Sequence, residues 1–122
     1  MILSSPVELF IPWKQPNERI HYVMNNFEGH IKGDKPVVID FYADWCQPCK
    51  MMEPVLHQVK EKIGDRATIL KLNIDKSPYY SQLYNILAVP TLIIFKRGNI
   101  LGRKNGVATT EEILHHLNFH IP

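Results

Sequence analysis

Two cysteines, Cys46 and Cys49, carry the strongest chemical signal of this sequence. They lie at a C-x-x-C spacing within the segment DFYADWCQPCKMMEP, residues 40–54. Pairs with this spacing occur as catalytic dithiols, as halves of metal sites and as short structural disulfides. The residues around the pair indicate which of these three chemistries applies.

A structural disulfide and a metal site are both poorly supported. A bridge between Cys46 and Cys49 would close only a short loop, and the stabilisation that a disulfide gives grows with loop length. A closed zinc site needs four protein ligands. The chain has no other cysteine, and no histidine or carboxylate pair stands at a zinc-like spacing from these two. We therefore expect neither a metal nor another cofactor.

The flanking elements would place both thiols at the start of a helix. Residues 36–42, PVVIDFY, form an apolar run that predicts a buried strand, and residues 46–63 carry apolar side chains at helical spacing. Free N–H groups and the dipole at a helix N-terminus stabilise a thiolate, so we expect a lowered pKa for Cys46. Cys49, one turn later, would stay a thiol on the same face. An accessible thiolate beside a resolving thiol is what disulfide exchange requires.

The rest of the chain predicts an α/β fold, with a central mixed sheet of about four to five strands flanked by helices on both faces. Apolar patterns predict a strand over 67–75 and a hairpin of 91–96 and 99–104 around Arg97-Gly98. Further helices are predicted over 17–31 and over 77–87, the second beginning at Ser77-Pro78. A last helix is predicted to begin at the capping box formed by Thr109 and Glu112. A strand over 7–11 is ambiguous.

Length and charge set further bounds. The 122 residues, 45% of them apolar, suit one domain with a sizeable core. The net charge of +2 comes from interspersed basic and acidic residues, so we expect no nucleic-acid or membrane partner. No stretch approaches the roughly 18 consecutive apolar residues of a transmembrane helix.

The N-terminal segment MILSSPVELFIPWK lacks a basic n-region and a small-residue cleavage site. A signal peptide is therefore not expected, and the chain is predicted to be cytoplasmic. An exported form would require that a signal had been trimmed. We assign residues 1–16 to an N-terminal extension and residues 17–122 to the domain.

The segment DFYADWCQPCK resembles the active-site segment of the thioredoxin family, whose usual form is DFWAxWCGPCK. Further motifs follow in the family's order, namely KLNID at 71–75, AVPT at 88–91, FKRG at 95–98 and Gly106. The resemblance covers residues from about 36 to 117. It implies the thioredoxin fold and dithiol–disulfide exchange with protein substrates.

The resemblance implies catalytic roles for four residues. Cys46 would attack a substrate disulfide, and Cys49 would resolve the mixed disulfide. Asp40, an acid in an otherwise apolar strand, would be buried with a raised pKa, exchanging a proton with Cys49 through water beside Lys71. From the residues alone, Asp40 is equally compatible with a solvent-facing acid and Lys71 with an ordinary surface lysine.

The resemblance also implies a docking surface of Trp45, Val89, Pro90 and Gly106. The bond before Pro90 would be cis, and the Val89 backbone would pair with an extended substrate segment. Without the resemblance, Val89 is compatible with a core valine and Gly106 with a turn glycine.

The chain departs from the family pattern at three positions, of which Tyr42, where the family often has Trp, is a change that the family tolerates. Gln47 replaces the usual Gly, and with Pro48 it lies between the cysteines, where residues tune the thiolate pKa and the redox poise. Asn105 is polar where the family usually carries an apolar residue beside Gly106.

The function that these observations predict is protein-disulfide reduction in electron transport and cell redox homeostasis, by a monomer recharged by a thioredoxin reductase. The first alternative is an exported oxidoreductase with a narrow substrate range or a more oxidising poise. The second is a non-catalytic interaction domain, which would not need a buried acid under a dithiol.

Overall fold

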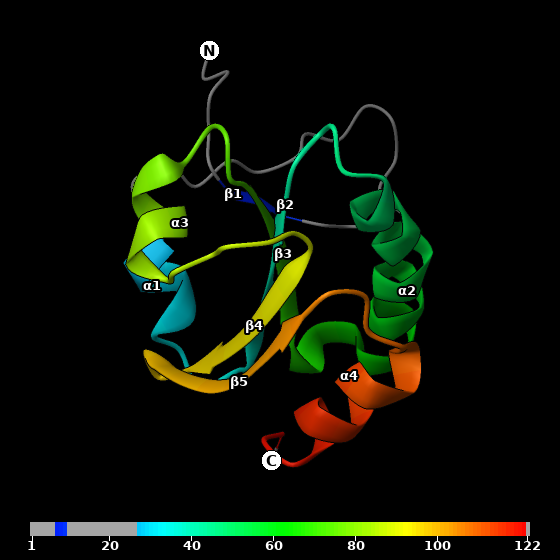
Figure 1. Ribbon diagram of the computed structural model, residues 1–122. Helices are drawn as coiled ribbons and strands as arrows, with labels where there is room; N and C mark the ends of the chain where they lie inside the picture. The colour runs from blue at the N-terminus through cyan, green and yellow to red at the C-terminus, as the bar shows by residue number, and fades with distance from the viewer. Residues whose placement is uncertain (1–6, 10–26, 122) are drawn as a thin grey trace, which may run out of the picture.

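The computed structural model describes residues 7–9 and 27–121, which form one mixed sheet between two layers of helices (Figure 1). In this described part the sheet has five strands in the order β1-β3-β2-β4-β5. Neighbouring strands β2 and β3 are parallel, and the other neighbours are antiparallel. The strands are β1 (Val7–Leu9), β2 (Val37–Tyr42), β3 (Thr68–Asn73), β4 (Thr91–Lys96) and β5 (Asn99–Asn105). The helices are α1 (Phe27–Ile31), α2 (Gln47–Ile63), α3 (Pro78–Leu83) and α4 (Thr110–Asn118), with a 3-10 turn η1 (Gly64–Arg66) after α2.

Helices cover both faces of the sheet, with α1 and α3 on one face and α2 and α4 on the other (Figure 1). Side chains of a strand alternate between faces, so β2 contributes to two cores. Val38 packs with α2 and α4, whereas Ile39 and Phe41 pack with α1 and α3. The predicted α/β fold, a mixed sheet flanked by helices on both faces, is confirmed.

The helix that begins beside the dithiol is anchored by its apolar stripe. Met52, Leu56, Val59 and Ile63 of α2 recur at helical spacing and are buried against the sheet and α4. The helix ends at Gly64, whose φ of 60° lies in the left-handed region that favours glycine. Both the predicted helix and its predicted stop are confirmed.

The third helix is shorter than the predicted span of 77–87. It ends at Leu83, because Asn85 adopts a φ of 57° and turns the chain away from the helical path. Ser77 occupies the predicted N-cap position, but its hydroxyl makes no capping hydrogen bond.

The C-terminal part of the fold follows its sequence patterns closely. β4 and β5 form the predicted hairpin, with Arg97 and Gly98 at positive φ in its turn. α4 carries the predicted capping box, in which Thr109 and Glu112 satisfy one another's backbone N–H groups.

The N-terminal predictions are tested only in part. Of the segment 7–11, Val7–Leu9 forms β1 and pairs with β3. Of the predicted helix over 17–31, the structure describes Phe27–Ile31, and residues 17–26 lie outside the described residues. The boundary between an extension over 1–16 and a domain over 17–122 stays a prediction. Among the described residues, no helix has the length and apolar character needed to cross a membrane.

Candidate active site

Cys46 and Cys49 lie at the start of α2, shortly after the end of β2. Cys46 is the N-cap of the helix, Pro48 stands in its first turn, and the Cys49 N–H donates a hydrogen bond to Cys46 Sγ at 3.1 Å. A disulfide joins the two cysteines, whose Cα atoms are 5.3 Å apart. A donor aimed at Cys46 Sγ stabilises negative charge there, so the helix start favours a thiolate at this position once the pair is reduced.

The dithiol is less accessible than the sequence predicts. Cys46 is 3% exposed and Cys49 is 5% exposed. The Cys46 side chain packs beside Ala43 and Val89, and its Sγ lies 3.6 Å from the Val89 carbonyl oxygen. The expectation of an accessible Cys46 is therefore wrong for this disulfide form, because the sulfur turns toward the loop before β4.

Asp40 is buried on the sheet face that α2 covers. Successive side chains of a strand point to opposite faces, so Asp40 lies on the same face as Val38 and opposite to Ile39 and Phe41. Asp40 is only 1% exposed. Burial raises the pKa of Asp40 to about 7, while the Lys71 charge lowers it and the Glu53 charge raises it. The prediction of a buried acid with a raised pKa is confirmed, and the solvent-facing alternative is wrong.

Lys71 lies beside this acid. It is the register partner of Asp40 in the parallel pairing of β2 and β3, and its side chain is 14% exposed. Its ammonium group forms an ion pair with Glu53 of α2 and lies 4.4 Å from the centre of the Tyr42 ring. The Lys71 side chain is therefore held by Glu53 and by the Tyr42 ring and is mostly buried, so the surface-lysine interpretation is wrong.

Sequence reasoning missed Glu53. The signal was available, because Glu53 follows Cys49 by one helical turn and so shares its face of α2. A pocket of about 120 Å³ opens between these groups, large enough for ordered water. Its lining residues are Tyr42, Ala43, Asp44, Cys49, Lys50, Glu53 and Lys71.

The loop before β4 and the end of β5 meet beside the disulfide. The Val89–Pro90 peptide bond is cis, as the family resemblance implies. The Gly106 N–H donates a hydrogen bond to the Pro90 carbonyl at 2.7 Å, and Gly106 has a φ of 95°. Val89, Pro90 and Gly106 are thus brought together next to Cys46.

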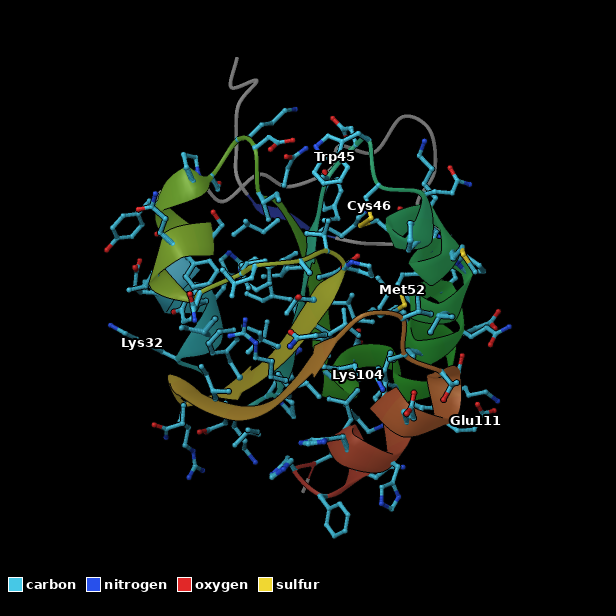
Figure 2. All side chains as sticks on the ribbon, in the orientation of Figure 1. Lys32, Trp45, Cys46, Met52, Lys104 and Glu111 are labelled. Atoms are coloured by element: carbon cyan, nitrogen blue, oxygen red, sulfur yellow. A yellow bond between two sulfur atoms is a disulfide. The ribbon has the colours of Figure 1, made fainter. Side chains whose placement is uncertain are left out.

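Trp45 directly precedes Cys46. Figure 2 shows it next to Cys46 at the beginning of α2, and it is 70% exposed. Its indole N–H donates to Asp75 at 2.9 Å, which fixes the ring although most of it faces solvent. Asp75 was not singled out from the sequence, since an acid after a strand gives no sign of a partner thirty positions earlier. Gln47 and Pro48 are exposed at the start of the helix.

Metal ligation finds no support in the described part of the chain, where no group of three or more His, Cys, Asp or Glu side chains is placed to hold an ion. The site instead combines a disulfide at a helix start, a buried acid with a pKa near neutrality, and an ion pair at the mouth of a small pocket. Such a site suits proton-coupled thiol chemistry.

Comparison with known proteins agrees with this chemistry. The family model described as Thioredoxin matches residues 18–118. A thioredoxin of Alicyclobacillus acidocaldarius subsp. acidocaldarius is 43% identical over 88 residues, 72% of this chain and 84% of that protein. A thioredoxin of Acidithiobacillus ferridurans is 37% identical over 80% of this chain and 92% of its own length. Thioredoxin Y, chloroplastic, of Oryza sativa subsp. japonica is 41% identical over 68% of this chain and 49% of its own length.

Proposed function

Because the chain belongs to the thioredoxin family and is a thiol–disulfide oxidoreductase, we propose that it reduces protein disulfides with Cys46 as nucleophile and Cys49 as resolving thiol. The observation that carries the proposal is the Cys46–Cys49 disulfide at the start of α2, the helix that covers the sheet face of the buried acid Asp40. A binding domain without catalysis would gain nothing from an acid buried under the helix that carries the two thiols.

The first step is attack by the Cys46 thiolate on one sulfur of the substrate disulfide. A Cys46–substrate disulfide forms, and the other substrate sulfur leaves as a thiolate. The hydrogen bond from the Cys49 N–H to Cys46 Sγ favours the thiolate before attack.

The second step frees the substrate. Cys49 gives its proton to the Asp40 carboxylate through water, and its thiolate then attacks Cys46 Sγ. The second substrate sulfur leaves, so the substrate gains two electrons and the Cys46–Cys49 pair becomes a disulfide. A pKa of about 7 suits Asp40 to both accepting and returning a proton near neutral pH. Lys71 and Glu53 set the charge around this transfer.

Substrate docking is assigned to Trp45, Val89, Pro90 and Gly106. The Val89 carbonyl lies beside Cys46, so an extended segment that pairs with the Val89 backbone would bring its disulfide to the nucleophile. Gln47 and Pro48, exposed between the cysteines, tune the poise of the pair.

The proposed partners are disulfide-containing proteins and, as electron donor, a thioredoxin reductase. We also propose a cytoplasmic location and a monomeric state. The partner proposals are supported by the matches to two bacterial thioredoxins, which extend over 84% and 92% of those proteins.

The test is capture of the mixed disulfide. Cys49→Ser removes the resolving thiol, so a disulfide-bonded protein substrate should remain covalently attached to Cys46 and appear as a reducible complex on a non-reducing gel. Cys46→Ser should give no complex. Complexes formed equally well by both variants, or by neither, would contradict the assigned roles.

A further inference from the structure

A second pocket lies beside the proposed docking surface, and none of its lining residues has a role in the mechanism described above. It has a volume of about 280 Å³ and is lined by Asn85, Leu87, Ala88, Arg103 and Asn105. The first three belong to the loop between α3 and β4, and the other two belong to the end of β5.

Two lining residues of the pocket are chain neighbours of docking residues. Asn105 directly precedes Gly106, whose N–H is bonded to the Pro90 carbonyl. Ala88 directly precedes Val89, whose carbonyl lies beside Cys46. A substrate segment paired with the Val89 backbone would therefore pass the mouth of this pocket.

Arg103 gives the pocket a fixed positive charge. Its guanidinium donates to the carbonyl oxygens of Tyr84 at 2.5 Å and Asn85 at 2.7 Å, which anchors it across from β5 to the α3–β4 loop. Neutral carbonyl groups orient the guanidinium without neutralising it. No acidic side chain is among the residues that line the pocket.

Asn105 adds hydrogen-bond donors. Its Oδ1 already accepts from Thr91 at 3.3 Å and from Arg103 Nε at 3.4 Å. The amide Nδ2 donates no hydrogen bond to any residue in the described part of the chain. The polar side of the pocket thus offers a cation and an amide donor, while Leu87, which is 85% exposed, and Ala88 offer apolar walls.

We propose that this pocket is a specificity subsite for the carboxylate side chain of a glutamate or aspartate in the substrate segment near the reactive disulfide. A carboxylate only accepts hydrogen bonds, so it complements the guanidinium and the free amide, and its methylene groups fit the apolar wall. The inference rests on the proposed reductase function and adds a substrate class to it.

The experiment compares disulfide-bonded peptides that differ by one side chain. Each carries glutamate at one of the three positions on either side of the cysteine, and each has a counterpart with glutamine there. For at least one position, we expect kcat/KM to be about fivefold higher for the glutamate peptide, the size of one partly exposed charge-assisted contact. This preference should shrink as salt is added.

Variants assign the preference to the pocket. Arg103→Gln should abolish the glutamate preference, and Asn105→Asp, which places a carboxylate in the pocket, should reverse it. Arg97→Gln removes an exposed arginine from the β4–β5 turn and should leave the preference unchanged. The readout is the ratio of kcat/KM for the glutamate peptide to that for the glutamine peptide. If a substitution loosens the α3–β4 loop and lowers activity toward both peptides, this ratio does not change.

Two outcomes overturn the inference. One is equal kcat/KM for glutamate and glutamine peptides at every position, and the other is a preference that survives Arg103→Gln. In both cases the glutamine peptides are still reduced, so the reductase function stands. If the wild-type protein reduces no peptide at all, the proposed function fails and the subsite fails with it.

Discussion

Lys71 and Glu53 form an ion pair that joins β3 to α2 beside the dithiol. The same lysine is the register partner of Asp40, so its charge acts on two carboxylates, one buried and one partly exposed. Burial has the largest effect on the pKa of Asp40, Lys71 opposes it, and Glu53 reinforces it. The proton of the buried acid is therefore controlled from α2 as well as from the sheet.

The buried acid makes stability depend on pH. The pKa of Asp40 rises from 3.8 to about 7 on folding, so the unfolded chain loses its proton first. Stability should fall as pH rises from about 4 to about 7 and then level off. Asp40→Asn should remove this decline and stabilise the fold at pH 8 by at most about 4 kcal/mol, while slowing turnover.

Urea unfolding of the wild-type protein and Asp40→Asn across pH 4–9 measures the effect. Asp44→Asn, which alters an exposed acid near the same site, is the matched control. Parallel stability curves for the wild-type protein and Asp40→Asn would show that residue 40 does not titrate with folding.

Glu53→Gln should lower the pKa of Asp40. The substitution removes a negative charge that favours the protonated acid, and it leaves the Lys71 charge in place. The inflection in the pH dependence of the resolving step should therefore move to lower pH, as measured by rapid mixing in single-turnover experiments. Glu61→Gln, at an exposed position of the same helix, should leave it unmoved. An unchanged inflection in Glu53→Gln would separate this residue from the proton transfer.

Gly106→Ala should destabilise the protein by about 1–2 kcal/mol, because a φ of 95° is unfavourable for any residue with a Cβ atom. A Cβ there would meet no other atom within 4 Å, so backbone strain alone accounts for the effect. Gly33→Ala also has open space and serves as the control in chemical denaturation. Equal stability of the two variants would rule out strain at Gly106.

Neighbouring methionines test the orientation of α2, and hence of the dithiol at its start. Met52 is fully buried between the helix and the sheet, and Met51 is 58% exposed. Met52→Ala should cost about 2–5 kcal/mol of unfolding free energy, whereas Met51→Ala should change it by less than about 0.5 kcal/mol. Similar losses in urea titrations of both variants would mean that the helix face is wrongly placed.

Local patterns were sufficient to predict most of the fold. Apolar runs gave the strands 36–42 and 91–96, and the helix over 46–63 followed from its apolar spacing and from Gly64. The early end of α3 was missed because Asn85, a residue type that often adopts the left-handed conformation at helix ends, was not used as a stop signal.

The site was less predictable because its properties depend on pairs distant in sequence. The cysteines form a local motif, but Asp40 alone does not reveal whether its strand face is covered. The partners of Lys71 and Trp45, namely Glu53 and Asp75, lie on other elements and become neighbours only when the sheet and α2 assemble.

The reduction potential of the Cys46–Cys49 pair tests the central claim most directly. It is measured by equilibrating the protein with a glutathione couple or a reference thioredoxin and quantifying the free thiols. A reductase requires a strongly reducing pair, so we predict a value in the region of about −270 mV, as is typical of thioredoxins. A value near about −120 mV, typical of a dedicated oxidant, would contradict the assignment as a reductase.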